Sequence, residues 1–271
     1  MTEPKKLDIQ VPEKLPESDF DCPRHGGYRG HAIKMSLLGR ARVYDPPCPK
    51  CEAEKADEQK RHERDRLDAA RMERLASMNI DKMYWGKGFD TFEAHGPELK
   101  KHLDTARRFA EKPEGKLVML GNNGAGKTHL AASILQRTGG IFFTAYEIGV
   151  NLRHSYNGGT REKDVLDELC SVPLLVIDEV GRTKEGSGAD ERWMSHVINK
   201  RHANFMPLVL ISNRHLKRDC LEDTVKGCPK CLERYFDDDV ISRIIEDGEI
   251  MKFTGGDYRR KIREKRGGKA A

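Results

Sequence analysis

The sequence predicts an α/β protein with a doubly wound, parallel sheet, and three observations support that class. Four short apolar blocks lie between about residues 117 and 211, and a weaker fifth lies near residue 250. Runs that are apolar at every position are typical of strands buried on both faces of a parallel sheet. The segments between the blocks are long enough for crossover helices. A glycine-rich loop follows the first block, where such folds bind nucleotides.

The expected strands are Leu117–Leu120, Ile141–Thr144, Leu174–Ile177, Leu208–Ile211 and, less strongly, Ile250–Phe253. A chain of 271 residues can bury one good core and leave a remainder for a small accessory module.

The composition predicts a soluble protein and not a membrane protein. Hydrophobic residues make up 37% of the chain and charged residues 34%. No apolar run approaches the roughly 20 residues that a membrane span needs, and residues 1–6 contain no apolar signal segment. We therefore expect a cytoplasmic protein with no membrane partner. The net charge of +5 is compatible with nucleic acid binding but does not by itself indicate it.

The order of segments predicts five regions. Residues 1–20 contain prolines among charges and predict a flexible lead; residues 21–52 contain paired cysteines and predict a zinc-binding module. Residues 53–77, rich in Glu, Lys, Arg and Ala, predict a solvated connecting helix whose apolar positions are too sparse for a coiled coil. Residues 78–258 form the expected nucleotide-binding domain, and residues 259–271 a basic tail.

The loop after the first strand matches the phosphate-binding pattern G-x-x-x-x-G-K-[ST] in full. Its glycines let successive backbone N–H groups point at phosphate oxygens, and the following helix adds the positive end of its dipole. The lysine should reach the β- and γ-phosphates of ATP, and the threonine hydroxyl should ligate Mg²⁺. The expected nucleotide-binding residues are Gly121, Asn122, Asn123, Gly124, Ala125, Gly126, Lys127, Thr128 and His129.

A pair of carboxylates follows the third expected strand. Asp178 and Glu179 come directly after an apolar run, which is the pattern of a Walker B element. We expect Asp178 to hold Mg²⁺ through its water shell, and Glu179 to orient and deprotonate the attacking water.

Two short motifs near the N-terminus predict a structural zinc site. Cys22 and His25 form one pair, and Cys48 and Cys51 form another, each with the spacing that tetrahedral Zn²⁺ requires. His31 could replace His25 less neatly. This segment has too little apolar mass to fold without a metal.

A second group of potential zinc ligands lies between the fourth and fifth expected strands. It consists of His215, Cys220, Cys228 and Cys231. Both a second small zinc loop and an insert with free thiols fit this spacing. Cys170 is expected to be a core residue.

The whole set of motifs resembles the DnaC/DnaI-type bacterial helicase loaders and the related IstB-like transposition ATPases. The resemblance covers about residues 78–260. Besides the phosphate loop and Walker B element, the segments that support it are Met78–Ile80, Phe89–Phe92, Tyr146–Tyr156, Asn199–Asn213, Val240–Ile244 and Gly255–Arg259.

The resemblance implies an AAA+ P-loop NTPase core with a parallel five-stranded sheet, joined to a small zinc-knuckle module by the connecting helix. It implies ATP hydrolysis with self-association, contact with single-stranded DNA, and delivery of a DnaB-type replicative helicase onto DNA. By this resemblance, Asn213 would help to position water beside the γ-phosphate. Arg243 would be an arginine finger that completes a neighbour's site, unless it forms only a helix-surface ion pair. Arg259 would approach the nucleotide.

The resemblance also assigns the zinc module to helicase binding, with DNA contact as its alternative. Basic groups that could bind single-stranded DNA occur in residues 153–163, in residues 200–202 and in the tail. The alternative functions are a transposition helper ATPase and a zinc-dependent adaptor whose assembly is switched by ATP, with little ATP hydrolysis.

Overall fold

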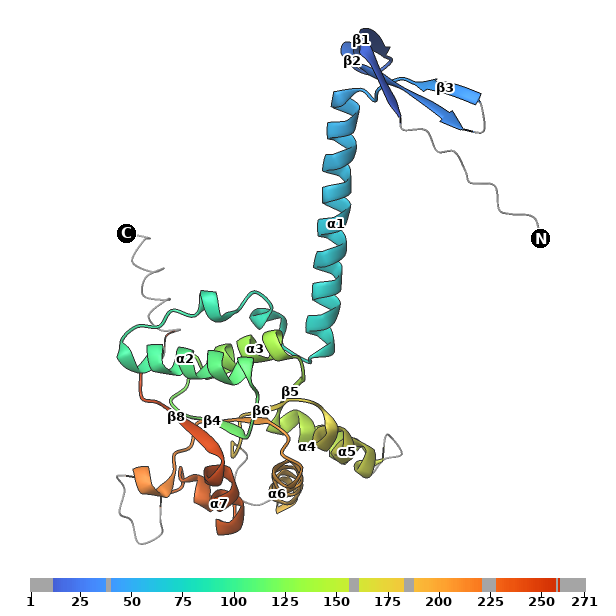
Figure 1. Ribbon diagram of the computed structural model, residues 1–271. Coiled ribbons are helices and arrows are strands. Elements are labelled where there is room, and N and C mark those ends of the chain that lie inside the picture. The colour runs from blue at the N-terminus through green and yellow to red at the C-terminus, as the bar shows by residue number, and fades with distance from the viewer. Residues whose placement is uncertain are drawn as a thin grey trace, which may run out of the picture. The chain divides into compact units, whose positions relative to one another are not determined.

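The computed structural model describes residues 12–37, 40–155, 161–182, 188–220, 228–256 and 258 (Figure 1). The chain divides into two compact units, residues 1–72 and residues 73–271. The described residues contain no helix that is long and apolar enough to cross a membrane.

The N-terminal unit contains a three-stranded antiparallel sheet in the order β1-β2-β3. Its strands are β1 (Glu13–Cys22), β2 (Gly26–Leu37) and β3 (Arg40–Tyr44). The flexible lead expected over residues 1–20 is therefore wrong for the part from Glu13 onward. That part pairs along its length with β2, and its mostly exposed, charged side chains give no apolar signal. Residues 1–11 lie outside the described part of the chain.

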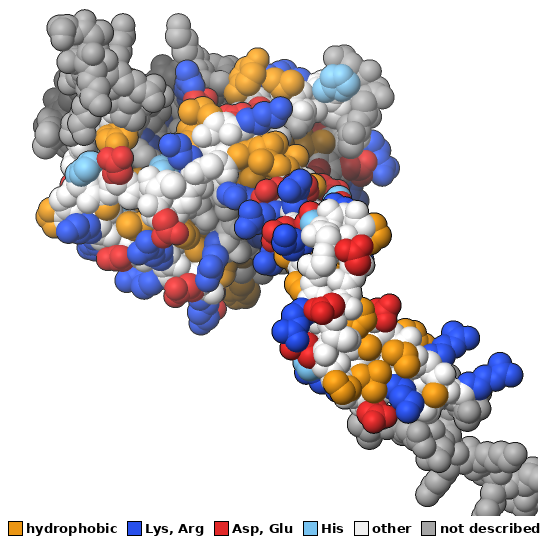
Figure 2. Space-filling model, turned by 90° about the horizontal axis from the view of Figure 1, so that it is seen from above, with side chains coloured by type: hydrophobic (Ala, Val, Ile, Leu, Met, Phe, Trp, Pro, Cys, Tyr) orange, Lys and Arg blue, Asp and Glu red, His pale blue; other side chains and the backbone are white. Residues whose placement is uncertain are grey.

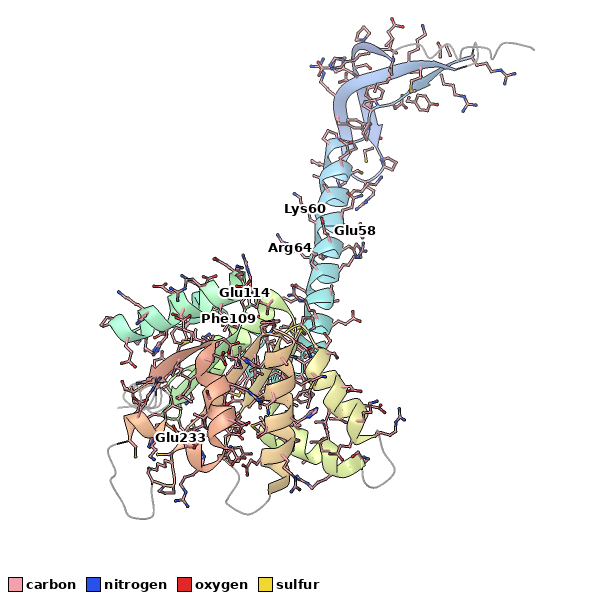
Figure 3. All side chains as sticks on the ribbon, turned by 60° about the horizontal axis from the view of Figure 1, so that its bottom comes forward. Glu58, Lys60, Arg64, Phe109, Glu114 and Glu233 are labelled. Carbon is pink, nitrogen blue, oxygen red and sulfur yellow. The ribbon has the colours of Figure 1, made fainter. Side chains whose placement is uncertain are left out.

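Helix α1 (Pro49–Ser77) follows the sheet, with a proline at its start, where the missing N–H is not needed. It begins a few residues earlier than the expected connecting helix, so Cys51 lies in its first turn. Leu75 is its buried residue. Charged side chains such as Glu58, Lys60 and Arg64 project from it into solvent (Figure 3).

The second unit contains a five-stranded parallel sheet in the order β5-β6-β7-β4-β8, which confirms the predicted fold class. The strands are β4 (Lys116–Gly121), β5 (Ile141–Thr144), β6 (Leu175–Asp178), β7 (Leu208–Ser212) and β8 (Gly248–Phe253). All five lie on or next to the expected apolar blocks. Strand β4 pairs with both β7 and β8, so the phosphate loop that follows it lies between the carboxyl ends of these two strands.

Helices cover both faces of this sheet (Figure 1). One face packs against α2 (Pro97–Glu111) and α3 (Lys127–Thr138). The other packs against α4 (Ala145–Ser155), α5 (Glu162–Ser171), α6 (Gly188–Ala203) and α7 (Asp238–Glu246). Alternate residues of β4 enter opposite cores, as Leu117 and Val118 do. The continuous apolar runs are thus explained by burial on both sides.

Short 3-10 helices occur between these elements in the described part of the chain. They are η1 (Lys82–Tyr84), η2 (Phe89–Thr91), η3 (Lys217–Asp219) and η4 (Leu232–Arg234). The helices η1 and η2 lie in the segment between α1 and α2. This segment packs onto the core through Met78 and Ile80.

Candidate nucleotide and metal sites

The phosphate loop joins β4 to α3, and two of its glycines have no room for a side chain. Gly121 has φ 123°, and a Cβ there would lie 2.1 Å from the Phe253 carbonyl oxygen of β8. Gly126 has φ 98°, and its Cβ would lie 2.7 Å from the Phe92 ring. Glycine is therefore the residue that can adopt these conformations without strain or overlap.

Lys127, the first residue of α3, is buried beneath the loop. Its Nζ donates hydrogen bonds to the Gly121 and Asn122 carbonyl oxygens, both at 2.7 Å. It also donates to Asn213 Oδ1 at 3.0 Å. Because Asn213 directly follows β7, the cation and the end of the central strand lie within one hydrogen bond of each other. A lysine held at this point can meet phosphate oxygens in the loop.

Thr128 and Asp178 provide neighbouring oxygen atoms at the ends of α3 and β6. The Thr128 hydroxyl donates to Asp178 Oδ2 at 2.7 Å, and the Glu179 amide donates to Asp178 Oδ1 at 2.6 Å. Burial raises the pKa of Asp178, and both hydrogen bonds oppose that rise. A hydroxyl and a carboxylate in contact form the type of oxygen donor set that Mg²⁺ prefers. These two residues therefore fit the predicted magnesium site.

Glu179 follows β6 with a φ of 59°, in the left-handed region that non-glycine residues rarely occupy. Strained backbone of this kind is concentrated at functional sites. Its carboxylate pairs with Arg182, and both residues line a surface hollow together with Thr144–Tyr146. The sequence did not indicate Arg182, because an arginine in a connecting loop has no distinguishing pattern.

His129 was predicted to contact nucleotide, but its side chain makes contacts of a different kind. Its Nε2 lies 3.0 Å from the Gly88 carbonyl oxygen and 3.2 Å from Thr91 Oγ1, and its ring meets the Phe92 ring edge to face. Burial lowers the pKa of the imidazole. His129 therefore fastens the segment at η2 against the phosphate loop.

The C-terminal end of the described chain lies against the same loop. The Asn122 amide donates to Phe253 O at 3.0 Å, and the Tyr258 amide donates to Gly124 O at 3.0 Å. The Tyr258 hydroxyl donates to a Glu93 carboxylate oxygen. Arg259 and the basic tail lie outside the described residues.

Arg243 lies on the outward side of α7. The apolar side of this helix, with Val240, Ile241 and Ile244, is buried, while Arg243 keeps 39% of its side chain exposed. Its guanidinium lies 3.9 Å from Asp239, one turn earlier. Such an exposed pair contributes little to stability, so the Arg243 side chain is not committed to the core of its own chain.

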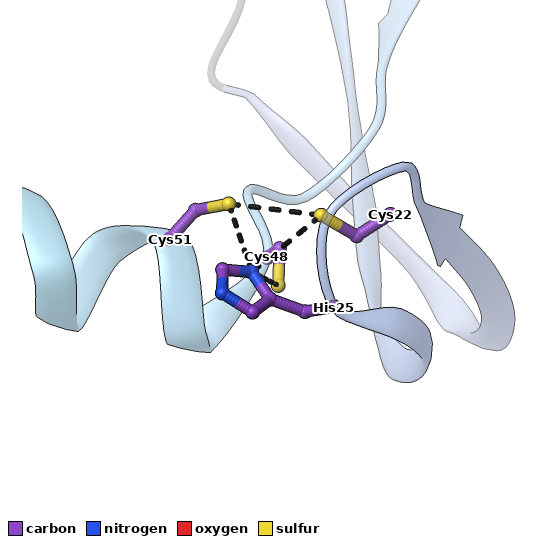
Figure 4. Close-up of side chains that lie close together, drawn as sticks. All are labelled: Cys22, His25, Cys48 and Cys51. Carbon is purple, nitrogen blue, oxygen red and sulfur yellow. Dashed lines mark hydrogen bonds between the residues drawn. The ribbon is translucent and has the colours of Figure 1, made fainter.

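The N-terminal motifs converge on one point, as predicted (Figure 4). Cys22 Sγ lies 3.6 Å from Cys51 Sγ and 3.8 Å from His25 Nδ1. His25 Nδ1 lies 3.7 Å from Cys48 Sγ and 3.2 Å from Cys51 Sγ. Tetrahedral zinc, with ligand bonds of about 2.0–2.3 Å, places its donors roughly 3.3–3.8 Å apart, so these distances fit.

His25, not His31, belongs to this group. His31 Nδ1 is engaged with the Leu15 carbonyl oxygen at 2.9 Å. His25 Nε2 lies 3.1 Å from Glu54 Oε1, the arrangement in which a carboxylate orients a metal-binding imidazole.

Ionisation of the Cys22 thiol opposes ionisation of the Cys51 thiol. The Arg24 amide lowers the pKa of Cys22 to about 6, whereas the hydrogen bond with Cys22 raises the pKa of Cys51 to about 11. A bound cation would allow all the thiolates to coexist. Among the described residues of this unit, Cys22 and Cys48 are two of the few that are buried.

The other cysteines separate into two kinds. His215, Cys220, Cys228 and Cys231 also come together, with one ligand atom each and all four atoms within 4.8 Å of one another. Cys170 is half-buried on α5 and packs against the core, and burial raises the pKa of its thiol.

The structure removes the central residue, Arg201, from one of the predicted DNA-binding groups. Arg201 is fully buried and donates hydrogen bonds to three backbone carbonyl oxygens, at Leu169, Pro173 and Pro207. His202 is partly exposed and contacts Lys116 and the carboxylates of Glu246 and Asp247. Arg201 is therefore not available to bind DNA, because the helix turns it into the core, while Lys200 remains exposed.

The group in residues 153–163 is only partly described. Arg153 and His154 are exposed on α4, and Arg161 and Lys163 are exposed at the start of α5. Arg161 forms an ion pair with Asp164. Tyr156 lies outside the described residues.

Comparison with known proteins places this geometry among ATP-binding proteins. The family model described as "IstB-like ATP binding protein" matches residues 52–266. Similar curated proteins include the replicative helicase loader DnaC of Escherichia coli strain K12, with 26% identity over 159 residues, covering 55% of this chain and 64% of the relative. DnaC of Buchnera aphidicola from Acyrthosiphon pisum is 26% identical over 156 residues, covering 54% and 63%. The chain thus spans just under two thirds of the length of these relatives.

Solved structures give the same result. The crystal structure of the DnaC helicase loader matches with a TM-score of 0.54 and 26% identity, covering 64% of this chain and all of that one. The AMPPCP-bound DnaA of Aquifex aeolicus matches with a TM-score of 0.53 and 18% identity, covering 70% and 56%. The structure of DnaI matches with a TM-score of 0.52 and 18% identity, covering 65% and 96%. The last two identities establish the fold alone.

Proposed function

Because this chain belongs to the IstB-like ATP-binding family and has the AAA+ fold, we propose that it is an ATPase that loads a replicative helicase onto DNA. The observation that carries the proposal is the convergence of Lys127, Thr128, Asp178, Glu179 and Asn213 at the carboxyl edge of the sheet. The similarity to helicase loaders supports the biological role.

ATP would supply the phosphoanhydride bond whose cleavage drives the cycle. The loop amides and Lys127 would bind its phosphates, and Thr128 and Asp178 would hold Mg²⁺. Glu179 would take a proton from the attacking water, and Asn213 would orient that water. The hydrogen bond between Lys127 and Asn213 supports this division of roles, since it brings both groups to one end of the loop.

Self-association would complete the site. In this proposal Arg243 of one copy offsets the negative charge that develops at the γ-phosphate held by its neighbour. Its exposed position on α7 supports the proposal, since the side chain is not committed to the core of its own chain.

The N-terminal unit would bind the helicase. Ile33 and Met35 lie on the same face of β2, and Tyr44 of β3 pairs opposite Ile33 on that face. Their exposed fractions are 42%, 43% and 50%. Figure 2 shows hydrophobic side chains on the surface of this unit. An apolar face on a small sheet that zinc would stabilise suits a protein partner better than a phosphate backbone.

Single-stranded DNA would contact the exposed cations of α4 and α5. Arg153 and Lys163 support this proposal, since both are exposed and the segment between them carries further polar residues. Contacts of this kind depend on salt and not on base sequence.

The experiment is a pull-down of the purified DnaB-type helicase of a bacterial host by the full chain. We expect wild type to retain the helicase, and deletion of residues 1–52 or the double variant Ile33→Ser/Met35→Ser to lose it. Val43→Ser is the matched control, because Val43 is 56% exposed but pairs with Lys34 on the other face. Helicase binding that survives both changes would exclude this unit as the docking site.

A second candidate is a transposition helper that organises duplex DNA, which the resemblance to the IstB-like transposition ATPases implies. It predicts ATP-dependent binding to duplex DNA with no helicase in the complex. An adaptor that ATP switches would show ATP binding with almost no phosphate release. The same preparation, tested for duplex binding and turnover, separates the three functions.

A further inference from the structure

The chain between β7 and α7 contains a second group of zinc-type ligands, separate from both the nucleotide site and the N-terminal site. His215 Nε2 lies 3.6 Å from Cys228 Sγ and 3.4 Å from Cys231 Sγ. With Cys220, the four ligand atoms all lie within 4.8 Å of one another. These separations are those of donors around one tetrahedral ion, roughly 3.3–3.8 Å apart, with little adjustment.

The second half of this group repeats the N-terminal motif. Cys-Pro-Lys-Cys occurs at residues 228–231 and, with the same four letters, at residues 48–51. In the later copy the Cys231 amide donates to Cys228 O at 3.2 Å, and the Lys230 amide donates to Cys228 Sγ at 3.4 Å. An amide aimed at a sulfur stabilises a thiolate, which is the form that binds a metal. Cys228 and Cys231 are buried, although Pro229 and Lys230 between them are exposed.

We propose that His215, Cys220, Cys228 and Cys231 bind one Zn²⁺, so that each chain carries two zinc ions. Three sulfurs and one imidazole are ligands that select zinc over Mg²⁺ or Ca²⁺. All four positions would be filled by protein, which makes the site structural and not catalytic. The cysteines of this group form no disulfide in the structure, so no disulfide competes with a metal for them.

Hydrogen bonds connect the proposed site to the loop that follows Glu179. Arg214 lies between Asn213 and His215, and its Nε donates to the Gly181 carbonyl oxygen at 2.6 Å. Its Nη1 donates to the Cys231 carbonyl oxygen at 3.4 Å. Gly181 has no room for a side chain, since a Cβ would lie 2.5 Å from Arg214 Nε. Arg214 therefore links the ligand loop to the Walker B loop.

Hydrogen bonds also connect the proposed site to η4, the short helix that precedes α7. The Leu232 amide donates to His215 O at 2.8 Å, and the Lys217 amide donates to both carboxylate oxygens of Glu233, each at 2.8 Å. Glu233 lies on η4, near α7 (Figure 3). Zinc would thus fix the connection between Asn213 and the helix that carries Arg243. This positioning role rests on the function proposed above, whereas the metal site itself does not.

The first test is the metal content of the full chain, purified without added metal and measured by mass spectrometry. We expect two zinc ions per chain in wild type and one in both Cys228→Ser/Cys231→Ser and Cys48→Ser/Cys51→Ser. Cys231→His keeps a ligand and should keep two ions, and Cys170→Ala, outside both groups, should also keep two. Circular dichroism checks that each variant is folded.

A folded wild type with one zinc ion, unchanged in Cys228→Ser/Cys231→Ser, would overturn the proposed site. If that double variant does not fold, Cys220→Ser replaces it, because this half-buried thiol is the least enclosed of the three. Cobalt substitution gives an independent readout, since the thiolate-to-metal absorption of the second site should vanish in the variant and persist in Cys170→Ala.

The second test separates positioning from simple stability. Cys231→Ser should lower kcat for ATP at least several-fold while leaving the nucleotide dissociation constant close to wild type, and Cys231→His should restore kcat. Loss of zinc with unchanged kcat would exclude the positioning role and leave the metal site standing. Neither metal content nor kcat depends on helicase binding, so failure of the loading function would be seen separately.

Discussion

Gly126→Ala tests whether the phosphate loop binds nucleotide through its backbone geometry. Gly126 precedes α3 with φ 98° and ψ 6°, and an added Cβ would lie 2.7 Å and 3.2 Å from two atoms of the Phe92 ring. The substitution therefore introduces a left-handed alanine and an overlap at the same position.

The expected magnitudes follow from these two effects. A left-handed alanine costs about 1–2 kcal/mol, which in a domain of this size lowers Tm by about 2–8 °C. Shifting one loop amide away from a phosphate oxygen removes a charge-assisted hydrogen bond of about 1.5–3 kcal/mol. ATP affinity should then fall by about ten- to a hundredfold.

Gly139→Ala is the matched control, at the other end of the same helix. Gly139 has φ 82° and ψ −179°, a region also reserved for glycine, but no heavy atom lies within 4 Å of its would-be Cβ. Isothermal titration with a non-hydrolysable ATP analogue should show lost affinity for Gly126→Ala alone, while thermal unfolding should show lower Tm for both. Adding Phe92→Ala to Gly126→Ala should recover part of the affinity.

The reasoning would be refuted if Gly126→Ala and Gly139→Ala both bound the analogue as tightly as wild type. Equal losses of affinity in the two variants would also refute it, because the effect would then come from general destabilisation.

Four further predictions follow from individual residues. Glu179→Gln should bind ATP normally but release phosphate about 10²–10⁴ times more slowly, and undiminished release would remove it as the base. Arg243→Ala should be nearly inactive alone yet regain phosphate release when mixed with Lys127→Ala; no recovery at any ratio would count against an arginine finger. Arg201→Met leaves three carbonyls without their donor, so the urea-derived free energy of unfolding should fall by about 2–5 kcal/mol, and a change below 1 kcal/mol would contradict its structural role. Burial lowers the pKa of His102 below its ordinary value, so the stability that its neutral imidazole contributes is present above about pH 6.5 and lost as pH falls. His102→Gln should reduce the slope of the unfolding free energy against pH between about pH 7 and 5. An unchanged slope would exclude His102 as its cause.

The parallel sheet could be predicted from the sequence because burial on both faces leaves a direct trace. Each strand from β4 to β7 is a nearly uninterrupted apolar run, and the loop after β4 has a pattern that few other structures require. Chain order then places Asp178 and Asn213 at the same edge as Lys127, since parallel strands end together.

The remaining features depend on three-dimensional partners that the sequence does not mark. Strand β1 is mostly charged and exposed, so its pairing with β2 has no apolar period to reveal it. Arg201 and its basic neighbours form a uniform charged run, and only the helix orientation shows that the arginine is buried. Arg214 is likewise an ordinary loop arginine until Gly181 and Cys231 are brought beside it.

The most direct test of the whole account is the transfer of a DnaB-type helicase onto circular single-stranded DNA. Helicase that sediments with the circle is measured with ATP, with and without the full chain. We predict that wild type increases the DNA-bound helicase several-fold, and that Ile33→Ser/Met35→Ser and Lys127→Ala do not. Equal amounts of bound helicase in the presence and absence of the chain would contradict the proposed loading function.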